Sequence, residues 1–472
     1  MGRPPSSGYC QTCRKRRVKC GKEVPECRRC LASGHKCGGY DLPMRMHVMG
    51  VHWDRDGTQR MAPIKVLPPK PSAGLPLVSF RDEVAAAFFF QTFSWAPFWR
   101  SHLLRAISST SMPQIRTLNK ACFQAITYTH MGLRNGDAAL QIEGHQIYSS
   151  ALTSTQTILA NPLSKSQLAW LGETIILMGM YEFATNRVTG TGPEPPHHVG
   201  MAYILKRCGP KAFQTGPLLD LFRGCRTLLI CKGICSRTRT FLEDEKWKTI
   251  PWEHAPKTFE DRLMDILVDL PGIAEDLASP PAVGDDRQAA CRVKIVSHLT
   301  GLRQWRREWN IAHTRSIRTV TVEGEDDILP TRLVFSSTAQ AAEIMLYNEA
   351  LLFLTKLGAM AHMESTSSFA LRMTDGPGKE NLSFVPSDVV EPRLQPALET
   401  LMAMGSATKL FASSDEKRTV MTPAPLAAVY ITLMEEPALA GKWDQIMAKY
   451  FVFEDAEVVF AGYMAGIGDS WT

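Results

Sequence analysis

The stretch from Cys10 to Cys37, CQTCRKRRVKCGKEVPECRRCLASGHKC, decides how the N-terminal part of this chain folds. Its cysteines follow the spacing C-x2-C-x6-C-x6-C-x2-C-x6-C, in which the unit C-x2-C-x6-C occurs twice. Each C-x2-C pair can converge on one metal ion, and the third cysteine of the unit can return to the same ion. Thiolates with no other ligand type nearby favour zinc in tetrahedral geometry.

Two tetrahedral zinc ions need about eight sulfur positions, and the segment has fewer sulfurs than that, so two thiolates must serve both ions. The repeat therefore predicts one binuclear cluster with two Zn²⁺ per chain, ligated by Cys10, Cys13, Cys20, Cys27, Cys30 and Cys37. The alternatives are a disulfide knot and a different zinc module. The equal spacings argue against a different zinc module. A disulfide knot needs an oxidising compartment, and the N-terminal sequence shows no apolar signal segment that would direct the chain to one.

A basic segment lies between the second and third cysteines. Five of its six residues are cations, namely Arg14, Lys15, Arg16, Arg17 and Lys19. Such a run by itself is also typical of a nuclear-import signal or a solvated surface. Because two ligands of one metal bracket it, we expect a short rigid helix that enters a major groove, where arginine pairs bidentately with guanine.

Positive charge is concentrated in this part of the chain. Residues 1–40 hold ten Lys or Arg and two acidic residues, whereas the rest of the 472 residues hold 43 basic and 45 acidic ones. This asymmetry predicts a small head that binds a polyanion, attached to a large and nearly neutral body.

On these residues the head resembles the fungal Zn2Cys6 binuclear cluster family, the DNA-binding domain of fungal transcription factors. Pro25, shortly before the fourth cysteine, and Gly34 in the last loop belong to the same pattern. The resemblance implies that Cys10 and Cys27 bridge the two metal ions. The DNA contacts that it implies are Arg16 and Arg17 on the bases of a CGG-type half-site, with Arg14, Lys19 and Lys22 on phosphates.

The head departs from the family pattern at two positions. Arg17 stands where the family usually has lysine, and its planar guanidinium has a different reach from an ammonium group. Gly21 stands where aspartate is common. The first departure affects which base triplet is preferred, and the second loosens the loop between the repeats.

We expect a Zn2Cys6 domain at 8–40, a linker at 41–76 and an all-α domain at 77–472. The linker is rich in Pro and Gly, which exclude a continuous helix. Met44, Met46 and Val48 alternate with polar residues and predict one short strand or an extended segment. No heptad pattern supports a coiled-coil homodimer here, so the oligomeric state is left open.

Amphipathic helices are predicted throughout the body. Apolar residues step by three and four along three stretches, which we interpret as core-facing helix stripes: Leu168–Met178, Ile295–Trp309 and Ile344–Leu354. The body also resembles the regulatory domain of fungal-specific transcription factors, at Ser79–Glu83, His197–Pro210 and Trp247–Leu267.

Motifs for catalysis are absent from the sequence: it has no nucleophile elbow, zinc-protease helix, phosphate loop or dinucleotide-binding turn, so we expect no enzyme. His197 and His198 are interpreted as structural or solvated, and Cys225, Cys231 and Cys235 as buried free thiols. The basic run Arg303–Arg307 is interpreted as a solvated helix face. The acidic and apolar tail after Lys449 is typical of an activation segment or of a last docked helix.

Together these features predict a nuclear regulator of transcription by RNA polymerase II, which reads GC-rich half-sites in double-stranded DNA through a zinc cluster. The helical body would transmit a signal from an effector or from a partner such as a co-regulator or the transcription machinery. The alternative is a scaffold associated with nucleic acid or chromatin that binds without sequence preference.

Overall fold

The computed structural model of the chain describes residues 9–23, 26–38, 49–53, 59–63, 80–92, 103–104, 106–108, 112–185, 196–214, 216–279, 286–313, 315–321, 331–363, 382–385, 394–411 and 423–434. The chain divides into two compact units, Met1–Ser79 and Phe80–Thr472. The tail after Lys449 lies outside the described residues.

The small unit is built around its cysteines. Helix α1 (Gln11–Lys15) and helix α2 (Arg28–Ala32) flank the buried sulfurs, and only Tyr9 and Val18 among the described apolar side chains pack against them. Because so little apolar surface is buried, this core has to be held by metal–sulfur bonds rather than by hydrophobic burial.

An antiparallel hairpin follows within the small unit. Strand β1 (Met49–Trp53) pairs with strand β2 (Gln59–Pro63), with Met49 opposite Pro63 and Trp53 opposite Gln59. The strand predicted around Met44, Met46 and Val48 lies outside the described residues.

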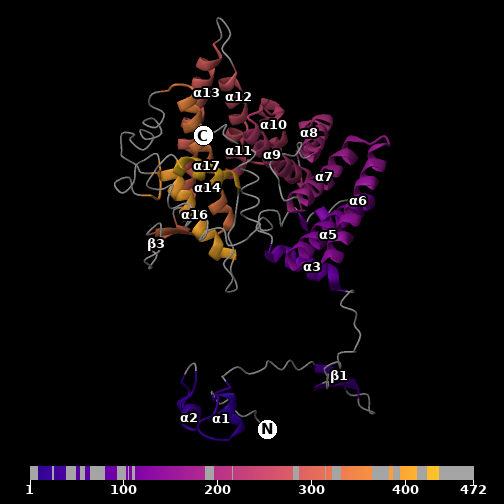
Figure 1. The fold of residues 1–472 in the computed structure, drawn as a ribbon, viewed down its shortest axis with the longest axis vertical. Coiled ribbons are helices and arrows are strands. Elements are labelled where there is room, and N and C mark those ends of the chain that lie inside the picture. The colour runs from indigo at the N-terminus through magenta and orange to yellow at the C-terminus, as the bar shows by residue number, and fades with distance from the viewer. Residues whose placement is uncertain are drawn as a thin grey trace. The chain divides into compact units, whose positions relative to one another are not determined.

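The large unit is mainly helical, as predicted (Figure 1). Its helices are α3 (Arg81–Thr92), α5 (Pro113–Asn135), α6 (Ala138–Leu159), α7 (Lys165–Thr185), α8 (Pro196–Cys208), α9 (Gly216–Ser236), α10 (Glu245–Thr249), α11 (Phe259–Leu267), α12 (Leu270–Ala278), α13 (Arg287–His313), α14 (Thr338–Met360), α16 (Gln395–Phe411) and α17 (Pro423–Met434). Short 3-10 helices are η2 (Pro210–Phe213), η3 (Phe241–Glu243) and η4 (Ile250–Trp252).

These helices pack in two groups joined by a middle section. Helix α5 contacts α3, α6 and α7, and α7 contacts α8 and α9. Helix α14 contacts α11, α12, α13, α16 and α17. Figure 1 shows α9, α10 and α11 between the violet helices at one side and the orange and yellow helices at the other. One continuous hydrophobic core runs through both groups, from Phe89 to Leu433.

The predicted helix stripes form this core. The stepping residues of α7 and α13 are buried, and so are those of α14 except Leu351, which is half-buried. Their side chains therefore serve packing, as the sequence indicated.

A second hairpin is an element that the sequence analysis did not predict. Strand β3 (Ile317–Thr321) pairs antiparallel with strand β4 (Thr331–Phe335). Leu333 and Phe335, two residues apart on one face of β4, are buried, and the strand contacts α16. The alternation is too short to stand out from the helical pattern around it. Within the described ranges, no helix is both long and apolar enough to span a bilayer.

Candidate metal centre and nucleic-acid interface

The cysteines are placed by two matching helix starts. Cys10 is the N-cap of α1 and its Sγ accepts a hydrogen bond from the amide of Cys13 at 3.3 Å. Cys27 is the N-cap of α2 and its Sγ accepts one from the amide of Cys30 at 3.4 Å. Free amide groups at a helix start stabilise negative charge, so both sulfurs are suited to be thiolates.

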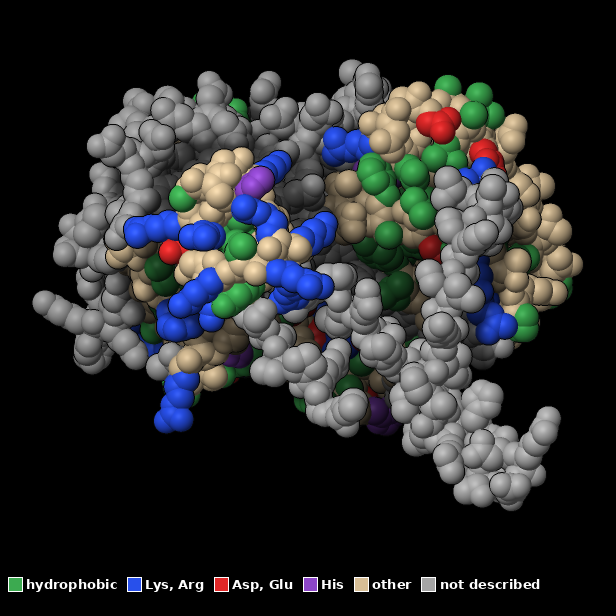
Figure 2. Space-filling model, turned by 90° about the horizontal axis from the view of Figure 1, so that it is seen from below, with side chains coloured by type: hydrophobic (Ala, Val, Ile, Leu, Met, Phe, Trp, Pro, Cys, Tyr) green, Lys and Arg blue, Asp and Glu red, His purple; other side chains and the backbone are tan. Residues whose placement is uncertain are grey.

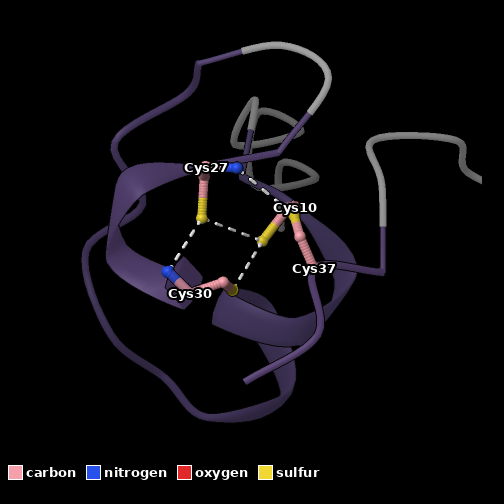
Figure 3. Close-up of side chains that lie close together, drawn as sticks. All are labelled: Cys10, Cys27, Cys30 and Cys37. Carbon is pink, nitrogen blue, oxygen red and sulfur yellow. Dashed lines mark hydrogen bonds between the residues drawn. The ribbon is translucent and has the colours of Figure 1, made fainter. Parts of the chain in front are cut away.

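The six sulfurs form two overlapping groups of four, and within each group the ligand atoms lie within 4.8 Å of one another. One group is Cys10, Cys13, Cys20 and Cys27, and the other is Cys10, Cys27, Cys30 and Cys37. Cys10 and Cys27 belong to both groups and their Sγ atoms are 3.6 Å apart. Figure 3 shows the sulfurs of the second group turned toward one another.

The spacing of the sulfurs fits tetrahedral zinc. Zn–S bonds of about 2.3 Å give tetrahedral edges of about 3.8 Å. The Sγ atoms of Cys10 and Cys30 are 3.7 Å apart, and those of Cys13 and Cys27 are 3.6 Å apart. These distances exclude disulfides, which need about 2.05 Å, and none of the chain's twelve cysteines, all of which lie within the described residues, forms a disulfide.

Further amide–sulfur bonds repeat between the two halves. The amide of Cys10 donates to the Sγ of Cys20 at 3.4 Å, and the amide of Cys27 donates to the Sγ of Cys37 at 3.5 Å. Burial raises the pKa of the Cys30 thiol to about 12 when no metal charge is present. A divalent cation offsets this cost, because it takes the thiolate form directly.

The basic segment departs from the predicted geometry. We expected a helix carrying Arg14 to Lys19, but α1 ends at Lys15, with Arg16 as its C-cap. Arg17 then adopts the left-handed conformation at φ 54°. The amide of Val18 reaches back to the Cys13 carbonyl at 3.1 Å, which closes a Schellman turn. The helix must end there because the chain has to return to the metal at Cys20.

The structure places the predicted DNA-contacting residues in one stretch around this turn. Arg16, Arg17, Lys19 and Lys22 are exposed, whereas Arg14, on α1, is half-buried. Figure 2 shows basic side chains crowded on this face of the small unit, with few acidic ones among them. Within the described residues, the side chain of Arg17 has no hydrogen-bond or ion-pair partner, so its guanidinium is available to a ligand.

Three hydrogen bonds that the sequence did not predict join the halves of the head. The Nη1 of Arg16 donates to the Oγ of Ser33 at 2.9 Å. The Thr12 hydroxyl donates to the Lys36 carbonyl at 3.0 Å and accepts from the Gly38 amide at 2.9 Å. Ser33 and Thr12 belong to no recognisable motif, so nothing in the sequence pointed to these contacts.

In the body, His197 is buried and bonds through Nε2 to the Tyr148 hydroxyl at 2.9 Å and to Glu182 at 2.9 Å. This supports its interpretation as a structural residue. Of the three clustered cysteines, all of which we interpreted as buried, Cys225 is buried, but Cys231 and Cys235 are half-buried, so the interpretation is wrong for these two. All three are free thiols.

The interpretation of the basic run on α13 as a solvated face is wrong for Arg306. Its side chain is 1% exposed and forms an ion pair with Glu399, which is also 1% exposed, at 2.7 Å. The arginine lies four residues after the buried Leu302 and three before the buried Trp309, so it shares the core-facing side of the helix.

A cleft of about 980 Å³ opens on the large unit. Five basic and four acidic side chains line it, from α8, α10, α12, α13 and the connections between them. Three of the cations are paired with carboxylates. The other two are Lys206, whose ammonium lies 4.8 Å from the centre of the Phe241 ring, and Lys294.

Comparison with known families agrees with the geometry of the head. The family model of the fungal Zn(2)-Cys(6) binuclear cluster domain matches residues 9–46. The N-terminal part of this chain is therefore a member of that domain family, and its cluster binds two zinc ions.

Two curated relatives match a short part of the chain, about the length of this domain. The aspercryptin biosynthesis cluster-specific transcription regulator atnN of Emericella nidulans is 56% identical over 45 residues, which are 8% of this chain and 7% of that protein. The arginine metabolism regulation protein II of Saccharomyces cerevisiae is 49% identical over 45 residues, which are 10% of this chain and 5% of that protein. No solved structure matches significantly.

Proposed function

We propose that this chain is a sequence-specific, DNA-binding regulator of transcription by RNA polymerase II that acts in the nucleus. In this proposal all six cysteines ligate the two zinc ions, and Cys10 and Cys27 bridge them. Arg16 and Arg17 read the bases of a CGG-like half-site, and Arg14, Lys19 and Lys22 neutralise phosphates. The proposal gives the chain no catalytic role.

The observation that carries the proposal is the convergence of six sulfurs on two groups that share Cys10 and Cys27. This arrangement fixes a turn of exposed cations on a rigid support, which is what base reading in a major groove needs. The regulators that match the head support the same role for this chain.

We further propose that the helical body is the regulatory domain and that it receives an effector or a partner. The support is local: the stretch His197–Pro210 forms α8 and the start of η2, and its Lys206 and Pro210 line the cleft of the large unit. The mixture of charges in the lining favours a polar ligand over an apolar one.

The first test selects duplexes from a random pool with full-length, zinc-loaded protein. We expect enrichment of one GC-rich triplet, present once or twice, and the spacing shows whether one or two heads bind. Enrichment of no sequence, together with salt-dependent binding to all duplexes, would instead support the scaffold alternative.

The second test separates base reading from phosphate binding. Arg17→Ala should cost about 1–3 kcal/mol on the selected duplex and less on random duplex, because it removes a guanine contact. Lys19→Ala should weaken both duplexes equally and lower the salt slope by about one. Arg116→Ala, at an exposed arginine of α5, is the control and should change neither. Equal losses for Arg17→Ala on both duplexes would make Arg17 a phosphate contact.

A further inference from the structure

The two halves of the head are structural repeats, and this extends past the cysteines to the way each helix ends. Arg16 is the C-cap of α1, and Ser33 is the C-cap of α2. The next residue is left-handed in both halves: Arg17 at φ 54° and Gly34 at φ 66°. Arginine therefore occupies a backbone position that glycine fills in the other half.

A left-handed arginine costs roughly 1 kcal/mol or more compared with glycine. Such a cost is retained where the side chain has a task that glycine cannot perform. Arg17 is exposed and its side chain has no partner within the described residues. The turn thus presents the unpartnered guanidinium of Arg17 directly beside the guanidinium of Arg16, which is hydrogen-bonded within the head.

The holding contact joins the two C-caps. The Ser33 hydroxyl donates its proton to the Arg29 carbonyl at 2.7 Å, so its lone pairs remain for a donor. Nη1 of Arg16 donates a hydrogen bond to the Ser33 Oγ at 2.9 Å. Both side chains are exposed, so the contact is not a product of burial.

One anchored nitrogen leaves most of the guanidinium available. The group carries five N–H donors in a fixed plane, and a bidentate contact to guanine uses two of them. Nε and Nη2 of Arg16 have no partner within the described part of the head. Fixing the plane before DNA arrives removes part of the ordering cost of a flexible arginine.

We propose that Ser33 is a specificity-determining positioning residue, which orients Arg16 for base contact from the opposite half of the cluster. The inference rests on the proposed function, since it needs a preferred duplex to exist. It assigns part of the sequence preference to a residue outside the basic segment.

The test compares full-length, zinc-loaded variants on the selected duplex and on random duplex. Ser33→Ala should lower affinity for the selected duplex about threefold to tenfold, the effect of losing one charge-assisted contact at an exposed site. Random duplex should bind as before. Ser33→Thr keeps the hydroxyl and should restore selectivity. Leu31→Ala truncates a neighbouring side chain on α2 that is 58% exposed, and it is the control.

A double-mutant cycle tests whether the effect of Ser33 on affinity acts through Arg16. If Ser33 acts through Arg16, then Ser33→Ala adds no further loss when Arg16→Ala is already present. A repeated selection with Ser33→Ala should show relaxed preference at one base position, with zinc content still at two ions. If Ser33 only stabilised the fold of the head, Ser33→Ala would not relax the preference at a single base position. Its loss of affinity would also not depend on whether Arg16 is present.

Several outcomes would overturn the inference while leaving the proposed function standing. These are an unchanged or increased affinity of Ser33→Ala for the selected duplex, equal losses on both duplexes, or additive losses in the cycle. Failure of the wild-type protein to select any sequence would overturn the proposed function itself, so the two failures are distinguishable.

Discussion

The buried ion pair between α13 and α16 gives a sharp test of how the body is held together. Glu399 accepts hydrogen bonds from Arg306 Nη1 at 2.9 Å and Nη2 at 2.7 Å. It also accepts from Asn348 at 3.0 Å, Ser383 at 3.2 Å and the Phe384 amide at 2.8 Å. The carboxylate is thus the meeting point of α13, α14, α16 and the segment 382–385.

The perturbation is Arg306→Met, which keeps an apolar stem and removes the charge. The carboxylate then stays buried with neutral donors alone, and breaking one partner of a buried pair costs about 3–5 kcal/mol. Replacing both partners, by Arg306→Met with Glu399→Leu, leaves no uncompensated charge, although three donors lose their acceptor. The double variant should therefore lose less stability than the sum of the two single variants.

The pH dependence has a definite sign. Burial acts to raise the pKa of Glu399, but the Arg306 guanidinium outweighs it and holds that pKa below the ordinary 4.5. A depressed pKa contributes stability above the unfolded-state value, and this contribution disappears as the pH falls through the folded-state value. In Arg306→Met burial prevails and the carboxyl group protonates readily. The stability difference between wild type and variant should therefore shrink as the pH falls from neutral to about 4.5, where the variant carboxyl group protonates on folding, and shrink further below 4.5 as the wild type loses its ion pair.

The assay is urea denaturation of the full zinc-loaded chain, followed by tryptophan fluorescence, since Trp309 lies beside Arg306. Arg116→Met, at an exposed arginine, is the control and should leave the transition unchanged. A loss below about 1 kcal/mol for Arg306→Met, or a loss that does not depend on pH, would refute the argument that the pair is fully desolvated.

Four further predictions concern other sites. Cys10→Ala should lose both zinc ions together, because its sulfur belongs to both groups of four; metal analysis that finds one ion and full DNA binding would contradict a shared ligand. Burial raises the pKa of Glu349 to about 8, so its carboxyl group is protonated in the folded chain at neutral pH. The unfolding free energy should therefore fall as the pH rises from 4.5 to 8, and denaturation of Glu349→Gln should show a smaller fall. Gly144→Ala should lower the melting temperature, because its Cβ would overlap Thr129 where α5 and α6 meet. At the exposed, helical Gly301 the nearest atom would be 3.9 Å away, so alanine there should stabilise by up to about 1 kcal/mol.

The zinc cluster could be predicted from the sequence because its ligands are local. Cysteine is the only residue type that supplies such a set of thiolates, and the repeat of the spacing fixes the stoichiometry before any contact between halves is known. The helix stripes were also readable, since the period of an amphipathic helix is a property of neighbouring residues. On α13, Ile295, Leu299 and Leu302 are buried while the residues between them are exposed or half-buried, as that period indicated, whereas α7 is buried on all sides from Leu171 to Met178.

The tertiary structure decided what depends on distant partners. A basic run is solvated by default, and Arg306 is buried instead because Glu399, 93 residues later, supplies the opposite charge. Helix α1 ends at Lys15 because the chain must turn back to the metal, which sets Arg17 in a left-handed conformation. The contact between Arg16 and Ser33 exists only once the sulfurs have brought the two halves together. The sequence by itself indicated which residue types supply metal ligands and cations. Tertiary folding decided which of these side chains form contacts within the protein and which remain available to a ligand.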